Sequence, residues 1–282
     1  MPLVSILSEL KKAQEKGYGI GCFDIVEALG TEGLISAMEK KRSPGIIGIW
    51  SGMLDRPNAR ALVNNTLAMA EDATIPVSLI LDHGQSFEYC IKAISLGFTD
   101  VMYDGSKLTL EENIANTQMV VRAAHAVGVN VEAELGQVGS GHNYQSFGGI
   151  REGFTNPDVV EMFVEKTGVD MLAIAIGTAH GFYQGDPEID LELLAEIRKR
   201  TDIPLVLHGG SGLSDDQFRS AVSGKISKIN IFTNLATETT KRMLEEAKSE
   251  KASYFSFTGK IREAFEYECE RLIDVFGSAD KA

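Results

Sequence analysis

The sequence predicts one eight-stranded (β/α)8 barrel, a TIM barrel, with extra helices at both ends of the chain. The 282 residues, 44% of them hydrophobic, suffice for a barrel of about 250 residues with extensions. Apolar, β-prone runs alternate with helical patterns eight times, which is typical of a parallel sheet that closes on itself. Three of the five histidines directly follow such a run. We expect residues 1–282 to form a single domain.

The first half of the chain supplies four strand–helix units after a short helix. That helix is expected at 5–16, with Ser5 as its N-cap, because Ile6 and Leu10 share one face. The strands are expected at 18–24, 45–51, from Pro76 to the 82–84 region, and 100–105. The helices that follow them are expected at 27–41, through Leu62 and Met69, at 87–96 and at 110–127, the last with a capping box on Thr109.

The second half continues the alternation and adds two irregular regions. Strands are expected at 130–136, from Met171, from Pro204 and at 228–233, with helices from Pro157, at 190–200 and after Ser214. The loop at 136–156 is longer than usual and rich in glycine and polar residues, which is typical of a mobile lid. The tail at 234–282 holds more than one helix, which would cap the barrel or pair with another subunit.

Composition excludes several classes of partner. With 40 acidic and 27 basic residues the net charge is -13, which argues against nucleic acid because phosphate backbones require a basic surface. No apolar run is long enough to span a bilayer, and the N-terminus lacks the features of a signal peptide. Three scattered cysteines do not form a disulfide framework. We therefore expect a cytoplasmic protein without a nucleic-acid or membrane partner.

Three histidines share one position relative to the predicted strands. His83, His180 and His208 each end an apolar run and precede a glycine, whereas His125 lies in a helical pattern typical of a structural residue. A parallel barrel gathers its carboxyl strand ends at one face. Three imidazoles that converge there, with an open fourth position, are typical of a catalytic zinc site, although cobalt or manganese could use the same ligands.

Carboxylates occur at the same predicted strand ends. Asp82 directly precedes His83, and successive strand residues point to opposite faces, so both reach the site only if the pleat breaks there. Asp82 is then a candidate general base, or alternatively a support for a ligand histidine. Asp104 ends the fourth strand. Glu132 and Glu134 share a face of the fifth strand, and Glu134, nearer its carboxyl end, is expected to be the functional one.

Two further stretches indicate a phosphate site. The glycine-rich run 209–212 follows the seventh strand, and 230–233 closes the eighth, where such barrels often hold a phosphate through backbone N–H groups. Zinc, a carboxylate and a phosphate cradle suit carbanion chemistry beside a carbonyl. Zinc can bind the oxygens of a ketose phosphate and stabilise an enediolate, while Asp82 takes a proton from the C4 hydroxyl during cleavage.

Six stretches together resemble the zinc-dependent class II aldolases, in the branch of the fructose- and tagatose-bisphosphate aldolases. They are L-D-H-G at 81–84, Y-D-G-S at 103–106, V-E-A-E-L-G at 131–136, A-I-G-T-A-H-G at 175–181, L-H-G-G-S-G at 207–212 and K-I-N-I-F-T at 228–233. The resemblance covers nearly the whole chain, and as a set the motifs are very specific. It implies reversible, metal-dependent cleavage of a ketose 1-phosphate or ketose bisphosphate to dihydroxyacetone phosphate and an aldehyde.

The resemblance also implies residue roles. Asp82 would be the acid/base and the three histidines the zinc ligands, with Asp104 and Glu134 associated with alternative metal positions and ligand support. The residues implied at the dihydroxyacetone-phosphate end and in substrate contact are Gly181, Gly209, Ser211, Asn230, Thr233 and Ser51. A monovalent cation, Na⁺ or K⁺, near Gly181 and Gly209 is a family trait. Apolar positions in the C-terminal helices suggest a homodimer or homotetramer, although packing within the chain explains them equally well.

The chain departs from the family pattern at several places. Gly84 replaces a second histidine, and Asp24 stands where relatives often have asparagine. The loop lacks the acidic residue that commonly donates a proton, so His142 or Tyr144 is the expected substitute. Strand eight ends I-F-T-N, which puts Phe232 at a position that is often polar. Neither Arg262 nor Arg271 falls in a recognisable pattern for the arginine that holds a distal phosphate.

These departures predict that the half of the site that binds zinc and stabilises the enediolate is intact. The half that binds the aldehyde is predicted to be altered. Our hypothesis is an enzyme that cleaves a ketose 1-phosphate whose distal end is not the usual phosphate. The alternatives are an ordinary fructose- or tagatose-1,6-bisphosphate aldolase and a non-catalytic aldolase-like partner subunit. A zinc hydrolase on the same barrel is a further rival, but it often carries an H-x-H pair on strand one, which is absent here, and it leaves the phosphate stretches unexplained.

Overall fold

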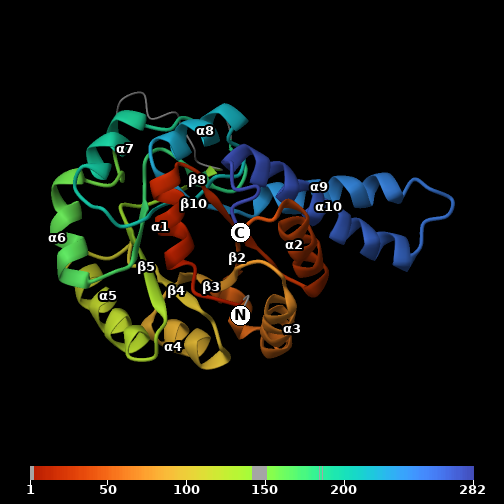
Figure 1. Ribbon diagram of the computed structural model, residues 1–282, viewed down its shortest axis with the longest axis horizontal. Helices are drawn as coiled ribbons and strands as arrows, with labels where there is room; N and C mark the ends of the chain where they lie inside the picture. Colours follow the sequence, from red (N-terminus) through yellow and green to blue (C-terminus); the bar gives the residue numbers. More distant parts are fainter. Residues whose placement is uncertain (1–2, 142–150, 184, 186) are drawn as a thin grey trace.

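An eight-stranded closed barrel forms the centre of the molecule (Figure 1). The computed structural model describes residues 3–141, 151–183, 185 and 187–282. Every pair of neighbouring barrel strands is parallel, which confirms the predicted TIM barrel. In their order around the barrel the strands are β1 (Ile20–Asp24), β10 (Ile226–Ile231), β9 (Leu205–Leu207), β7 (Met171–Ile174), β5 (Asn130–Leu135), β4 (Asp100–Tyr103), β3 (Val77–Gly84) and β2 (Gly45–Trp50).

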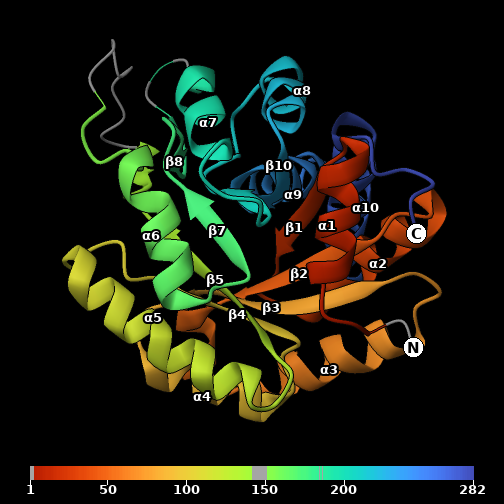
Figure 2. The ribbon, with the colours of Figure 1, turned by 60° about the vertical axis from the view of Figure 1, so that its left-hand side comes forward.

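Helices surround the barrel, as Figure 2 shows. Those that connect successive strands are α2 (Ala28–Lys41), α3 (Ala59–Asp72), α4 (Phe87–Leu96), α5 (Leu110–His125), α6 (Pro157–Thr167), α7 (Leu191–Arg198) and α8 (Asp215–Ser223). A 3-10 helix, η1 (Ser51–Asp55), precedes α3, and a small parallel pair, β6 (Gly139–Ser140) with β8 (Ala179–His180), lies outside the barrel sheet. The predicted capping box on Thr109 is present at the start of α5.

Helix α1 (Leu7–Lys16) closes one end of the barrel interior. Ile6 and Leu10 are fully buried in the same cluster as the inward-facing Ile20 and Ile80. The prediction that Ser5 is the N-cap is wrong, because the cap position is Ile6 and the Ser5 hydroxyl instead donates to Asp100 Oδ1 at 2.7 Å. That bond anchors the chain beneath the barrel before the helix begins. The opposite end of the barrel is left for the site.

Two long helices, α9 (Thr233–Glu246) and α10 (Tyr254–Phe276), project together from one side of the barrel (Figure 1). The C-terminal half of α10 packs inside the chain, where Phe265, Leu272 and Phe276 belong to the main core. Where the two helices meet away from the barrel, Tyr254 and Phe255 are exposed. Within the described ranges, no helix combines the length and apolar character needed to cross a bilayer.

The contact between α2 and α10 depends on Gly33, and we expect Gly33→Ala to destabilise the protein. An added Cβ would lie 2.4 Å from the Arg262 carbonyl oxygen, so one backbone must move. Overpacking of this kind costs about 1–3 kcal/mol of unfolding free energy. Gly259→Ala in α10 is the matched control, since a Cβ there has no described neighbour within 4 Å. Removing that helical glycine is expected to stabilise by about 0.5–1 kcal/mol. Denaturant unfolding measures both, and equal stability of the two variants would contradict the close contact.

Candidate active site

A cavity of about 430 Å³ lies at the carboxyl ends of the barrel strands. Most sequence-predicted site residues line it, namely Asp82, His83, Asp104, Glu134, His180, Gly181, His208, Gly209, Ser211, Asn230 and Thr233. Ser51 is not among the lining residues: it is buried, and its hydroxyl donates to the backbone oxygen of His83 at 2.6 Å. The structure therefore gives Ser51 the position of a support for the His83 backbone.

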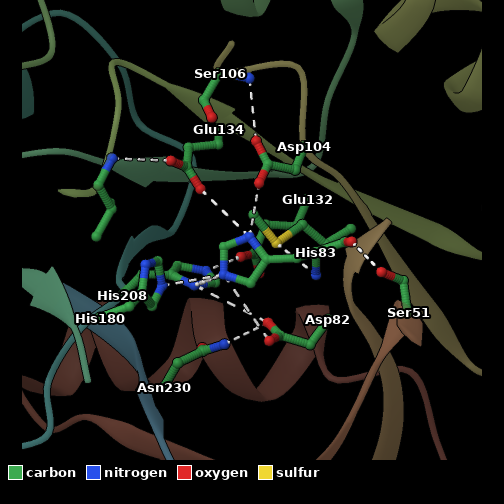
Figure 3. Close-up of polar contacts among 12 residues, drawn as sticks. Ser51, Asp82, His83, Asp104, Ser106, Glu132, Glu134, His180, His208 and Asn230 are labelled. Carbon is green, nitrogen blue, oxygen red and sulfur yellow. Dashed lines mark hydrogen bonds and ion pairs between the residues drawn. The ribbon is translucent and has the colours of Figure 1, made fainter. Parts of the chain in front are cut away.

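Strand β3 delivers two adjacent side chains to the cavity because its pleat breaks. His83 has φ of 46°, in the left-handed region, and the pairing of β3 with β4 shifts register between Leu81 and Gly84. A non-glycine residue held there stores roughly 1–3 kcal/mol of strain. The break lets Asp82 and His83 face the same space, as Figure 3 shows. Strain at this position is a sign of functional constraint.

The three imidazoles converge on one point (Figure 3). His83 Nε2 lies 3.1 Å from His180 Nε2 and 3.1 Å from His208 Nδ1. The outward nitrogens have acceptors: His83 Nδ1 lies 2.8 Å from Asp104, His208 Nε2 lies 2.8 Å from Glu132, and His180 bonds to the Gly139 backbone. A neutral imidazole carries one N–H, and these acceptors favour the tautomer that has the N–H on the outward nitrogen. When all three rings are neutral, the inward nitrogens present lone pairs to one another.

Such an arrangement fits a cation. Burial and the neighbouring His83 lower the pKa of His180 to about 4 and hold the pKa of His208 well below its ordinary value, so both rings are neutral ligands at pH 7. Burial opposes protonation of His83 too, but the carboxylates of Asp82 and Asp104 outweigh it and raise its pKa to about 10. A metal at this point must compete with that proton, because coordination needs the neutral ring.

Two carboxylates lie on the other side of His83. Its Nδ1 is 3.8 Å from Glu134 Oε2, and these atoms with Asp104 form a second group able to hold a metal ion. Burial and the charge of Asp104 raise the pKa of Glu134 to about 8. Glu134 Oε1 accepts from the Val138 N–H, whereas the buried Oε2 has no hydrogen-bond partner among the described residues. An unpaired buried carboxyl oxygen is costly unless a ligand completes it.

Sequence reasoning missed the importance of Glu132 and Lys228. Both are fully buried in the barrel, and Lys228 Nζ lies 2.7 Å from Glu132 Oε2. Burial disfavours the charged ammonium, but Glu132 outweighs it and raises the pKa of Lys228. The other oxygen, Glu132 Oε1, lies 2.8 Å from His208 Nε2. The ion pair with Lys228 therefore also fixes the orientation of the His208 ring. The sequence did carry a signal for this. Lys228 and Asn230 are two residues apart on one strand and so share a face, which places a lysine on the inward face of an apolar strand.

Asp82 lies beside the histidines. Its oxygens are 3.9 Å from His83 Nε2 and 4.0 Å from His208 Nδ1, and Oδ1 accepts from Asn230 Nδ2 at 2.7 Å. Asp24, whose side chain lines the same cavity, is a second acidic neighbour that sequence reasoning noted only as a departure. Burial and the charge of Asp82 raise the pKa of Asp24 well above its ordinary value. Asp24 therefore holds its proton more tightly than an ordinary aspartate does.

The glycine-rich stretch after β9 and the start of α9 meet at the cavity. Gly209 is in the left-handed region at φ of 66°, and its carbonyl accepts from the Tyr183 hydroxyl. Helix α9 begins at Thr233, and its N-cap residue Phe232 provides no side-chain cap, but the Asn234 N–H in the first turn donates to Ser211 Oγ at 3.3 Å. Ser211 and Thr233 both line the cavity, and helix N-termini favour anions through their N–H groups and dipole.

The remaining predicted residues lie outside this arrangement. Arg271 binds Glu268 and Asp215, Arg262 lies 3.5 Å from Glu266, and neither lines the cavity. His142 and Tyr144, the expected loop acids, fall in 142–150 and lie outside the described residues, as does the middle of the loop predicted as a lid at 136–156.

Fold and site define a parallel eight-stranded barrel with a histidine cluster able to hold a metal at its carboxyl face. The chain belongs to the class-II fructose-bisphosphate aldolase family, whose family model matches residues 4–281. It is 39% identical, over the full length of both chains, to a probable fructose-bisphosphate aldolase from Bacillus subtilis. It is 36% identical to the fructose-bisphosphate aldolase of Thermus caldophilus, over 99% of this chain and all of that one. The YdjI aldolase structure from Escherichia coli K12 superposes with a TM-score of 0.89 at 34% identity, covering 99% of each chain.

Proposed function

We propose that this chain is a metal-dependent lyase that reversibly cleaves a ketose 1-phosphate or ketose bisphosphate into dihydroxyacetone phosphate and an aldehyde. The observation that carries the proposal is the convergence of three imidazole nitrogens within reach of Asp82, in a cavity that ends at the start of α9. Membership of the class-II aldolase family supports the same reaction. The dihydroxyacetone phosphate half of the substrate would lie between these two features.

Zinc is the metal that we propose for the histidine cluster. His83, His180 and His208 would hold it, leaving an open coordination position, and the acceptors Asp104 and Glu132 fix the ring orientations that ligands need. When bound, the ion supplies a Lewis acid that draws electron density from the substrate carbonyl. Glu134, with its unpaired buried oxygen, would support a second metal position or a substrate hydroxyl.

The chain's own residues supply positioning and proton transfer. The N–H groups at the start of α9, with Gly181, Gly209 and Ser211, would hold the phosphate group. Asp82 would take the proton of the C4 hydroxyl as the C3–C4 bond breaks, which leaves the electron pair on C3 and releases the aldehyde. Asn230 holds the Asp82 carboxylate through a 2.7 Å hydrogen bond, so the base is oriented before substrate binds.

Aldol condensation tests this function. Protein loaded with zinc is expected to condense dihydroxyacetone phosphate with an aldehyde, and chelation followed by gel filtration is expected to abolish turnover until zinc is restored. Turnover unaffected by chelation would contradict a metal-dependent reaction. Bound zinc without condensation of any aldehyde would favour the non-catalytic partner subunit.

Three further features belong to the same proposal. Residues 1–282 would act as one catalytic domain, because the phosphate and metal sides of the cavity come from strands throughout the chain. A monovalent cation, Na⁺ or K⁺, would bind near Gly181 and Gly209, and activity measured with each salt tests it.

The exposed Tyr254 and Phe255 on the projecting helices support a homodimer or homotetramer. Light scattering gives the mass in solution, and a monomeric mass would exclude the assembly.

A further inference from the structure

We propose that Trp50, with the apolar side chains beside it, binds the carbon chain of the aldehyde partner, and that this partner is a hydroxyaldehyde without a distal phosphate. The inference rests on the proposed function and names the substrate class of that site.

Trp50 lies beside the proposed base. It ends β2 and pairs in register with Asp82 of β3, so both side chains leave the sheet on the same face. Asp82 handles the hydroxyl on C4, a carbon that comes from the aldehyde. The proposed phosphate cradle follows β9 and β10 instead. Trp50 is thus placed on the aldehyde side of the reacting bond.

The indole packs against Gly52 and is otherwise accessible. A Cβ added at Gly52 would lie 2.3 Å from the ring, so the indole lies directly over that glycine. Trp50 nevertheless remains 47% exposed and lines the cavity. A large apolar ring kept in water beside a reactive site offers its face to the C–H side of a sugar chain.

The side chains that follow β1 and β2 beside Trp50 are apolar. Val26, after β1, is 38% exposed, and Met53, in η1, is buried; both line the cavity. A phosphate dianion moved against such surfaces would lose water without gaining hydrogen bonds, which is costly. A neutral chain of hydroxyl-bearing carbons would bury apolar area there at little cost.

Positive charge is scarce around the aldehyde side. Among the described lining residues Lys107 is the one lysine or arginine, and it is exposed, whereas the acidic lining residues are Asp24, Asp82, Asp104 and Glu134. Residues 142–150 contain no lysine or arginine. Proteins usually hold a phosphate with arginine, lysine or several backbone N–H groups. The cavity provides such a set at α9 and lacks one beside Trp50.

A comparison of two aldehydes tests the proposal. With dihydroxyacetone phosphate as donor, kcat/KM for glyceraldehyde is expected to exceed that for glyceraldehyde 3-phosphate by about tenfold or more, which is about 1.4 kcal/mol. Preference for the phosphorylated aldehyde would overturn the inference. Exchange of dihydroxyacetone phosphate protons with solvent is measured in parallel, because it needs no aldehyde. If proton exchange occurs but the phosphorylated aldehyde is preferred, this inference alone is contradicted. If no proton exchange occurs, the proposed function is contradicted as well.

Trp50→Ala tests the role of the ring. The variant is expected to lose roughly 10- to 200-fold in kcat/KM for the neutral aldehyde, mainly through KM, and much less in proton exchange. Met119→Ala on α5, a comparably exposed apolar residue outside the cavity, is the matched control. Trp50 is the one tryptophan in the chain, so wild-type fluorescence reports on its surroundings. Glyceraldehyde added to protein saturated with donor is expected to change the emission. Unchanged emission, or equal losses in the two variants, would contradict the proposal.

Discussion

Asp82→Asn is expected to reduce kcat for aldol cleavage by roughly 10²- to 10⁴-fold, the usual contribution of a positioned general base. The amide keeps the volume of the carboxylate and the contact with Asn230 but cannot accept the C4 proton. The nearest histidine nitrogens lie 3.9 and 4.0 Å from Asp82, so it is adjacent to the metal cluster without being part of it. Zinc content and thermal stability should therefore stay close to those of the wild type. Steady-state kinetics with metal analysis of the same samples measures both.

Asp216→Asn is the matched control for this substitution. Its carboxylate lies on the surface of α8, where it accepts from Arg219, far from the cavity lining. Its kcat should equal that of the wild type. An Asp82→Asn enzyme with full kcat would remove Asp82 from proton transfer. Loss of zinc together with activity would instead make Asp82 a support for the ligands.

Lys228→Met is expected to lower both the free energy of unfolding and the affinity for metal. Glu132 would become a buried carboxylate without its countercharge, and breaking such a pair typically costs about 3–5 kcal/mol of unfolding free energy. Without the ammonium the Glu132 side chain also loses the contact that holds it in place, which loosens its hydrogen bond from His208 Nε2. His208 then loses the partner that keeps its Nδ1 turned toward the cluster. Metal affinity should fall by about 10- to 100-fold, as for other residues that orient a ligand.

Two variants separate these effects. Lys40→Met breaks an ion pair of the same 2.7 Å length on the surface, and little change in stability is expected there because solvent screens it. The double variant Glu132→Gln with Lys228→Met removes both buried charges and should recover part of the lost stability. Denaturant unfolding of metal-free protein and competition with a zinc chelator are the two measurements. A Lys228→Met protein as stable as Lys40→Met would contradict a structural role for the buried pair.

The sequence predicted the barrel well because each strand–helix unit is a local pattern. The strands expected at 18–24, 45–51 and 100–105 are present as β1, β2 and β4, and the Thr109 capping box is visible from two residues three apart. Ser5 shows the limit of local reasoning. Its hydroxyl could cap a helix, yet Asp100, 95 positions away, binds it instead. No local pattern reveals such a competitor.

The convergence of the site residues could be predicted from the barrel rule, but their partners could not. His83, His180 and His208 share a position at strand ends, which the sequence displays directly. That Glu132 faces both His208 and Lys228 depends on the register of β5 and β10 across the barrel interior. Because Asp82 and His83 are adjacent, the sequence required a break in the pleat there. The left-handed backbone of His83 and the shift in β3–β4 register that produce the break are visible only in the structure. The placement of Trp50 over Gly52 likewise follows from packing and not from spacing.

Zinc titration of metal-depleted protein tests the central claim most directly. Solvent exchange of dihydroxyacetone phosphate protons, followed by NMR, isolates the half-reaction that the histidine cluster and phosphate cradle would support. We predict negligible exchange without metal, a linear rise with added zinc and a plateau at one zinc per chain, with His208→Ala showing no rise at the same concentrations. Equal exchange by metal-free and zinc-loaded protein, or none in fully loaded protein, would contradict the assignment of the three histidines to a catalytic metal.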